Sequence, residues 1–86
     1  MANILDIKQK LAARVRIRRK EAKISQFELA GRSGVSLGSV KRFEGSGEIS
    51  LIHLLRIAAA LGYENDFDRL FERKNYQSID EILNAK

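Results

Sequence analysis

Arginine and lysine side chains crowd one short region of the chain, where the run RVRIRR covers residues 14–19 and Lys20 follows it. Guanidinium and ammonium groups bind anions, and a row of them suits a polyanion such as nucleic acid. The whole chain has the same bias, because 16 Lys and Arg against 11 Asp and Glu give a formal net charge of +5. Charge alone leaves a second interpretation open, a soluble protein that happens to be basic.

No other group of residues in the sequence suggests reaction chemistry. The chain has no cysteine, so disulfides and thiolate chemistry are excluded and a zinc site is not expected. His53 is the only histidine, and a lone imidazole without identifiable partners makes neither a metal site nor a catalytic triad. The glycines form neither GxGxxG nor GxxxxGK. We therefore predict a protein that is not an enzyme and that has no metal and no cofactor.

Apolar runs in the sequence are short. The longest, IAAALG at residues 57–62, is far below the roughly 20 residues that span a bilayer, and the N-terminus lacks the apolar core of a signal peptide. A chain of 86 residues is long enough for one compact domain. We expect a single cytoplasmic domain with no membrane-spanning segment.

The sequence predicts an all-α fold. It contains no proline and no sustained alternation of apolar and polar residues, so a sheet has little support. A first helix is predicted from Asn3, a potential N-cap, to near residue 22. Its apolar residues recur at helical spacing, and they are Ile4, Ile7, Leu11 and Val15.

Capping residues divide the next part of the chain into two short helices. Ser25 with Glu28 three residues later is a capping-box pattern that predicts the start of a second helix. That helix is predicted to end at Gly34, and Ser36 is positioned to cap a third, which the GSG sequence at residues 45–47 breaks.

Three further helices are predicted after the GSG sequence. Ser50 opens a fourth with a strong leucine stripe, and Gly62 closes it. Asn65 is a potential cap for a fifth helix, whose apolar residues Phe67, Leu70 and Phe71 we expect to complete the core. A capping-box pattern at Ser78 and Glu81 predicts a short C-terminal helix with Ile79, Ile82 and Leu83. The expected division is a domain over residues 1–71 and a helical extension over residues 72–86, which packs back, joins a partner subunit or remains mobile.

Two short helices joined through Gly34 suit a helix-turn-helix unit, which places its second helix in the major groove of DNA. Glycine adopts the left-handed conformation that a sharp turn needs, and Ala30 is small where the two helices would cross. An ordinary helical hairpin fits the same pattern, so the pattern alone does not decide between them.

A family resemblance favours the first alternative. The run IRRKEAKISQFELAGRSGVSLGSVKRFEGSGEISLIHLLRIAAALG resembles the Cro/CI-type, or XRE-type, helix-turn-helix repressor domain, and the similarity covers roughly Leu11 to Phe71. The matching features are Arg19, Ser25-Gln26, Leu29-Ala30, Gly34-Val35-Ser36, Val40, Glu44, Ser50-Leu51 and Leu54-Leu55. The resemblance implies a five-helix, lambda-repressor-like domain that binds DNA as a homodimer, with a recognition helix over about residues 37–44.

The resemblance also assigns roles to individual positions. It implies that Leu37, Gly38 and Arg42 face base edges, and a forked guanidinium such as that of Arg42 pairs well with guanine. Phosphate or flanking contacts are implied for Gln26, Ser36, Ser39 and Lys41. A structural ion pair is implied between Arg19 and Glu44, and a dimer interface at Phe67, Leu70 and Phe71.

Two departures from the family pattern bear on these expectations. Gly38 has no side chain where a polar residue is common, so DNA shape and dimer spacing would carry more of the specificity. Lys23 stands near the position of a usual helix-ending glycine. A left-handed lysine would cost about 1 kcal/mol, which a different turn would avoid.

The resulting hypothesis is a sequence-specific regulator that represses transcription from an inverted-repeat operator. The segment VSLGSVKRFEGSGEISLIHLLRIAAALG, with DFDRLF after it, resembles HipB-like antitoxins in particular. That resemblance implies a HipA-like kinase toxin as partner. A phage repressor or a restriction-modification controller protein is the alternative within DNA binding. A protein-interaction module that does not read DNA is the alternative from another class.

Overall fold

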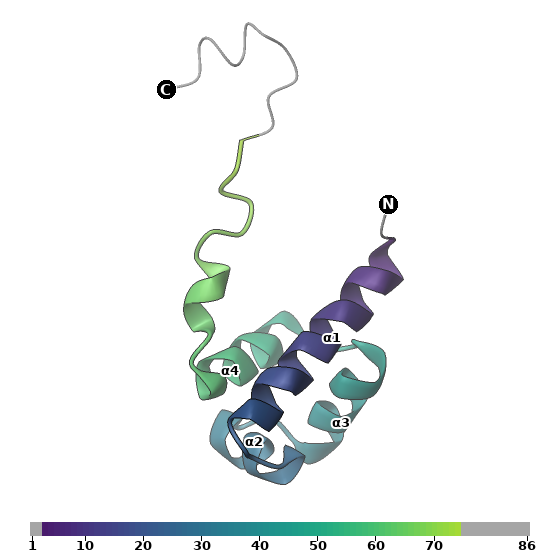
Figure 1. Ribbon diagram of the computed structural model, residues 1–86, viewed down its shortest axis with the longest axis vertical. Coiled ribbons are helices and arrows are strands. Elements are labelled where there is room, and N and C mark those ends of the chain that lie inside the picture. The colour runs from purple at the N-terminus through teal and green to yellow at the C-terminus, as the bar shows by residue number, and fades with distance from the viewer. Residues whose placement is uncertain (1–2, 75–86) are drawn as a thin grey trace, which may run out of the picture.

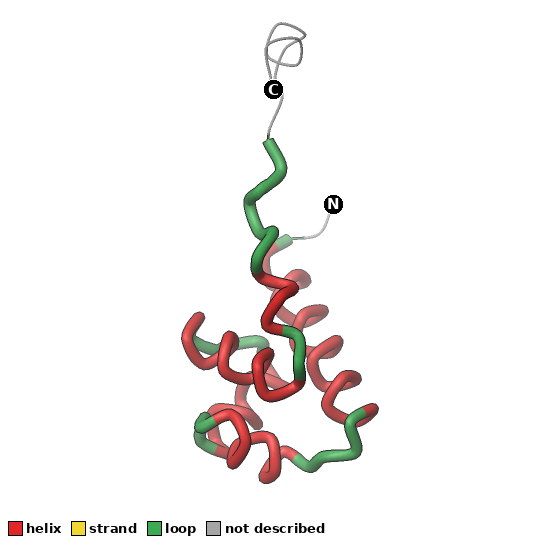
Figure 2. The backbone as a smooth tube through the Cα atoms, turned by 90° about the vertical axis from the view of Figure 1, so that its left-hand side faces the viewer, coloured by secondary structure: helices red, strands yellow, loops and turns green. Residues whose placement is uncertain are grey.

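The computed structural model describes residues 3–74, and within this range the chain forms helices and turns without strands (Figures 1 and 2). The order of elements is α1 Ile4–Glu21, α2 Gln26–Ser33, α3 Leu37–Ser46, α4 Leu51–Leu61 and the 3-10 helix η1 Glu64–Phe67. The all-helical class predicted from the sequence is confirmed for this part of the chain.

The four α-helices begin where the sequence predicts a cap. The side chain of Asn3 accepts the Asp6 backbone N–H at 2.8 Å, and the hydroxyls of Ser36 and Ser50 accept the backbone N–H three residues on. At Ser25 the capping box is complete: its hydroxyl accepts the Glu28 N–H at 3.0 Å, and the Glu28 carboxylate accepts the Ser25 N–H at 2.9 Å. Each cap satisfies backbone donors that a helix start leaves unpaired.

The core lies where non-consecutive helices meet. The main pairings are α1 with α3 and α2 with α4, while α2 also contacts α3. The largest fully buried side chains are Leu29, Val35, Val40, Phe43 and Ile57. Burial of each such side chain stabilises the fold by about 1.5–3 kcal/mol before the loss of chain entropy is counted.

Only the later part of α1 belongs to this core. Ala12 is buried, and Leu11 and Val15 are partly buried against the other helices, whereas Ile4 and Ile7 remain exposed. Figure 1 shows the first turns of α1 extending beyond α3 and α4. The apolar spacing in α1 therefore predicted the helix correctly but not how much of it is buried.

A tight contact holds α1 against the connection between α3 and α4. Gly47 ends α3 in the left-handed conformation, with φ of 80°, directly against the backbone of Lys8. The Lys8 ammonium group forms an ion pair with Glu48, the next residue of the connection. The α3 to α4 connection is thereby fixed to the first half of α1.

The predicted fifth α-helix is wrong. Asn65 caps no α-helix, and the region forms only the short η1 followed by turns with i to i+3 hydrogen bonds, such as Leu70 N–H to the Phe67 carbonyl. Phe71 has a φ of 62°, which interrupts a right-handed helix. A helix this short needs tertiary packing, whereas Leu70 and Phe71 remain 58% and fully exposed. The predicted helix at residues 78–83 lies outside the described residues.

The turn after α1 contains a left-handed lysine. From the sequence, a different turn was expected that avoids this conformation. Lys23 has a φ of 59°, in the left-handed region. The Lys23 N–H donates to the Lys20 carbonyl at 3.0 Å, and the Ile24 N–H donates to the Arg19 carbonyl at 3.4 Å. Burial of Ile24 accompanies this turn and offsets its strain.

No helix within residues 3–74 combines the length and the apolar character needed to cross a membrane.

Candidate nucleic-acid interface

The turn between α2 and α3 is built from three consecutive residues with different tasks. Gly34 has a φ of 73° and donates its N–H to the Ala30 carbonyl at 3.0 Å, which ends α2. Val35 is buried, and its N–H donates to the Ser33 hydroxyl at 3.2 Å. Ser36 then caps α3. The turn thus redirects the chain within three residues and seals the joint with an apolar side chain.

The third helix buries one face and exposes another. Val40 and Phe43 are buried in the core. Gly38, Lys41 and Arg42 are exposed, and they lie on the outward side of the helix. No carboxylate within residues 3–74 forms an ion pair with Lys41 or Arg42. Both cations are therefore available to a ligand on this face.

Three further residues predicted to contact DNA lie at the start of α3. Leu37 and Ser39 are partly exposed, and Ser36 is exposed. Ser36 donates its hydroxyl hydrogen to the Ser39 oxygen at 2.9 Å while its own oxygen accepts the Ser39 backbone N–H. Because a serine has only one hydroxyl hydrogen, Ser39 is the better placed of the two to donate to a phosphate.

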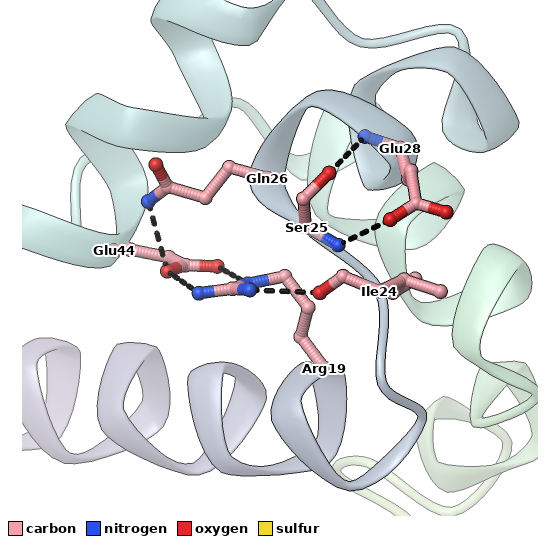
Figure 3. A network of polar contacts seen from close by, with 6 residues as sticks. All are labelled: Arg19, Ile24, Ser25, Gln26, Glu28 and Glu44. Carbon is pink, nitrogen blue, oxygen red and sulfur yellow. Dashed lines mark hydrogen bonds and ion pairs between the residues drawn. The ribbon is translucent and has the colours of Figure 1, made fainter.

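A buried ion pair joins α1 to α3 (Figure 3). The Arg19 Nε donates to Glu44 Oε2 at 2.7 Å and its Nη2 donates to Oε1 at 3.0 Å, a bidentate arrangement. The third donor used, Nη1, reaches the Ile24 carbonyl at 2.9 Å. The side chains are 9% and 4% exposed, so both charges are removed from water and depend on each other.

Gln26 connects this ion pair to the start of α2. Its Nε2 donates to Glu44 Oε1 at 3.0 Å, and Figure 3 shows its side chain directed from the α2 N-terminus toward Glu44. One amide hydrogen remains available, since the NH2 group has two. The first backbone N–H groups of α2 also lack intrahelical partners, which favours an anion there. Glu44 therefore holds the Gln26 amide beside the N-terminus of α2.

The link between Gln26 and Glu44 was missed by the sequence analysis. The resemblance suggested separate roles for these residues, a phosphate contact and an ion pair. They are 18 positions apart, in different helices. Nothing in their spacing indicates a contact, which depends on how α2 and α3 pack.

The three residues predicted for a dimer interface differ in how far they are buried. Phe67 is partly buried against the core, whereas Leu70 is 58% exposed and Phe71 is fully exposed. The expectation that all three complete the core is wrong for Leu70 and Phe71. Its cause is the missing fifth helix, without which these side chains do not reach the core.

A comparison with protein-family models gives a match that fits this geometry. The family described as helix-turn-helix matches residues 15–65, well over half of the chain and all of the unit from α2 to α3. The chain belongs to the XRE-type helix-turn-helix family. It is a DNA-binding transcription regulator of that family. No curated protein and no solved structure gave a significant match.

Membership of the family supports double-stranded DNA as the binding partner. His53 is partly exposed near the start of α4, in a different helix from the exposed cations of α3. Within residues 3–74, no cluster of three or more His, Asp or Glu residues could hold a metal ion.

Proposed function

We propose that the protein represses transcription by binding an inverted-repeat operator as a homodimer. The observation that carries this proposal is the exposed face of α3, where Lys41 and Arg42 stand outward while the opposite face is fixed in the core. A rigidly mounted helix with outward cations fits the DNA major groove. A regulator bound at such an operator would act by blocking access to a promoter.

Arg42 is the proposed base reader. Its planar guanidinium can donate two parallel hydrogen bonds to O6 and N7 of guanine, which discriminates against other bases by about 1–3 kcal/mol. Gly38 offers only its backbone to the groove, which permits close approach but supplies no side-chain contact. Leu37 is proposed to pack against a thymine methyl group. Much of the remaining specificity would come from DNA shape.

Phosphate contacts are proposed on both sides of this helix. Gln26 and the backbone N–H groups at the start of α2 would bind one phosphate, with Glu44 holding the amide in place. Ser39, Ser36 and Lys41 would bind phosphates or flanking bases at the other end. These contacts fix the position of α3 rather than its sequence preference.

Dimerisation is proposed through the region after η1. The exposed Leu70 and Phe71 are apolar side chains that a partner subunit would cover. Two-fold symmetry would then place the half-sites about 10 base pairs apart, or at a whole number of helical turns.

A toxin-antitoxin role is the more specific form of the proposal. The resemblance to HipB-like antitoxins supports it, with a HipA-like kinase toxin as partner and no catalytic activity in this chain. Purification from the native source tests this form: a kinase present in stoichiometric amount supports it, and purification without one contradicts it.

Selection of bound duplexes from a random pool tests the repressor proposal directly. The protein should enrich an inverted repeat and bind it as a complex with two chains, measured by light scattering. Equal affinity for the selected and random duplexes across a salt titration would contradict it. A charge reversal of Lys41 and Arg42 should abolish operator binding and leave dimerisation intact; loss of partner binding alone would instead indicate a protein-interaction module.

A further inference from the structure

A shallow hollow lies between α1 and the last turns of α3, with a volume of about 330 Å³. Its lining residues are Gln9, Ala13, Arg16, Ile17, Lys20 and Glu44. Those on α1 follow helical spacing, so they form one continuous face of that helix. The hollow begins before the part of the chain that matches the family, which starts at residue 15.

The hollow carries a net positive charge. Arg16 and Lys20 are exposed, and neither forms an ion pair with any carboxylate in the described part of the chain. Glu44 is the only acidic residue in the lining, and its side chain is almost completely buried and paired with Arg19. An anion in the hollow would therefore meet two cations and little opposing charge.

Apolar surface lies between these charges. Ala13 and Ile17 belong to the lining, and Ile17 is half exposed. A small inorganic anion gains nothing from contact with an apolar surface. A nucleic-acid backbone gains from it, because its phosphates alternate with sugars whose carbon atoms pack on apolar side chains. The hollow thus has the mixed chemistry of a backbone contact rather than of a site for a free ion.

The hollow is also continuous with the proposed phosphate contact at α2. Glu44 lines the hollow and accepts the hydrogen bond from Gln26, so the two sites lie on either side of one carboxylate. Both adjoin α3, the helix that enters the groove. The hollow therefore adjoins the site where Gln26 is proposed to bind a phosphate.

We propose that this hollow is a second binding site for the DNA backbone. Arg16 and Lys20 bind phosphate oxygens, and Ala13 and Ile17 contact the intervening sugar. The first helix thereby extends the DNA contact beyond the helix-turn-helix unit. The proposal rests on DNA binding by the family and is independent of the repressor and antitoxin roles.

The test is a salt titration of DNA binding by the double variant Arg16→Gln with Lys20→Gln, using a selected duplex and a random duplex. Each neutralised phosphate contributes about −0.9 to the slope of log affinity against log salt. Loss of two contacts should make the slope less steep by about 2 and weaken binding of both duplexes by about thirtyfold near 0.15 M salt.

Arg14→Gln is the matched control, because Arg14 is an exposed arginine on the same helix, outside the lining of the hollow. It removes one charge, so the single variant Arg16→Gln is its direct counterpart. Arg16→Gln should weaken binding by about fivefold and Arg14→Gln by less than about twofold. Thermal unfolding that matches the parent protein shows that each variant is folded.

Equal effects of Arg14→Gln and Arg16→Gln would overturn the proposal, because they would reflect net charge alone. An unchanged salt slope in the double variant would overturn it too. Failure of the repressor proposal has a different signature: the parent protein would bind selected and random duplexes equally well, while the difference between the Arg14 and Arg16 variants would persist.

Discussion

Glu44 accepts hydrogen bonds from two other helices at once, from Arg19 on α1 and from Gln26 on α2. One carboxylate therefore fixes how α3 sits relative to both. The resemblance indicated the Arg19 and Glu44 positions from the sequence, but neither the Gln26 contact nor the bond from Arg19 to the Ile24 carbonyl could be predicted. The bond to Ile24 depends on the turn at Lys23, whose left-handed conformation opposes the intrinsic preference of lysine. The Gln26 contact depends on how α2 packs against α3.

Removal of Glu44 should be far more damaging than removal of an exposed partner. We expect Glu44→Ala to lower the free energy of unfolding by about 3–5 kcal/mol, because it leaves the Arg19 charge buried and unpaired. Glu21→Ala is the matched control: Glu21 pairs with Arg18 at the surface, so its loss should cost at most about 1 kcal/mol. Urea denaturation measures both, and similar losses would contradict the structural role of Glu44.

Substitutions of the adjacent cations Arg42 and Lys41 should have different effects on DNA binding. Arg42→Gln should lower the preference for the selected duplex over random DNA by about fivefold or more, since a base contact is worth about 1–3 kcal/mol. Lys41→Gln should weaken binding to both duplexes alike, as expected for a phosphate contact. Titrations by fluorescence anisotropy give both ratios. An unchanged preference in Arg42→Gln would exclude Arg42 as a base reader.

At the scale of elements, the helix starts and most helix ends could be predicted because residues at the helix ends themselves determine them. Ser25, Ser36 and Ser50 cap helices through their own hydroxyls, and Gly34 and Gly62 end helices in the left-handed conformation. The element after α4 could not be predicted this way. Its apolar spacing was helical, but a short helix forms only where its apolar face is packed.

Two helix-ending glycines permit a controlled comparison of strain and close contact. Gly47 and Gly62 have similar φ values of 80° and 84°. A Cβ at Gly62 meets nothing within 4 Å, whereas one at Gly47 would lie 2.9 Å from the Lys8 carbonyl oxygen. We expect Gly62→Ala to cost about 1–2 kcal/mol from the left-handed backbone alone. Gly47→Ala should cost more, because α1 must also move.

Thermal or urea unfolding of the two alanine variants checks this expectation. Equal losses of stability would mean that the backbone of α1 at Lys8 moves aside at little energetic cost. A larger loss in Gly47→Ala would show that the contact between α1 and the α3 to α4 connection is rigid.

The capping box at the start of α2 should make stability depend on pH. Hydrogen bonds from the Ser25 backbone N–H and then from its hydroxyl lower the pKa of Glu28 below its ordinary value. A lowered pKa in the folded state means that the stabilisation is present above the ordinary pKa and is lost as the pH falls through the lowered one. Glu28→Gln keeps an acceptor for the Ser25 N–H but cannot titrate.

Urea unfolding of the parent protein and Glu28→Gln at about pH 7 and about pH 3 measures this effect. The parent protein should lose more stability between the two pH values than the variant does. Identical pH dependence would show that the Glu28 carboxylate contributes nothing as a cap.

At the scale of the whole molecule, apolar side chains remain exposed after η1. Leu70 and Phe71 lie in the last part of the described chain, and Phe71 is fully exposed. The sequence indicated an interface at these positions through the family resemblance. In the structure these residues do not complete the core, and their exposed side chains are therefore available for an interface.

Replacement of these side chains should separate the subunits. We expect Leu70→Ser with Phe71→Ser to convert a dimer to a monomer, measured by light scattering over a range of concentrations, and to weaken operator binding. Phe27→Ser is the control, since Phe27 is 74% exposed on α2 and outside the proposed interface. A double variant that remains dimeric at the lowest concentrations would place the interface elsewhere.

The pairing of α1 with α3 and of α2 with α4 also governs how the chain can fold. Neither the first two helices nor the last two bury a core by themselves, because each pair takes its packing partners from the other. The two halves must therefore acquire their structure together, which favours a single cooperative transition. If the backbone were cut in the turn at Gly34, neither fragment should fold alone, yet the two mixed fragments should reassemble into one domain.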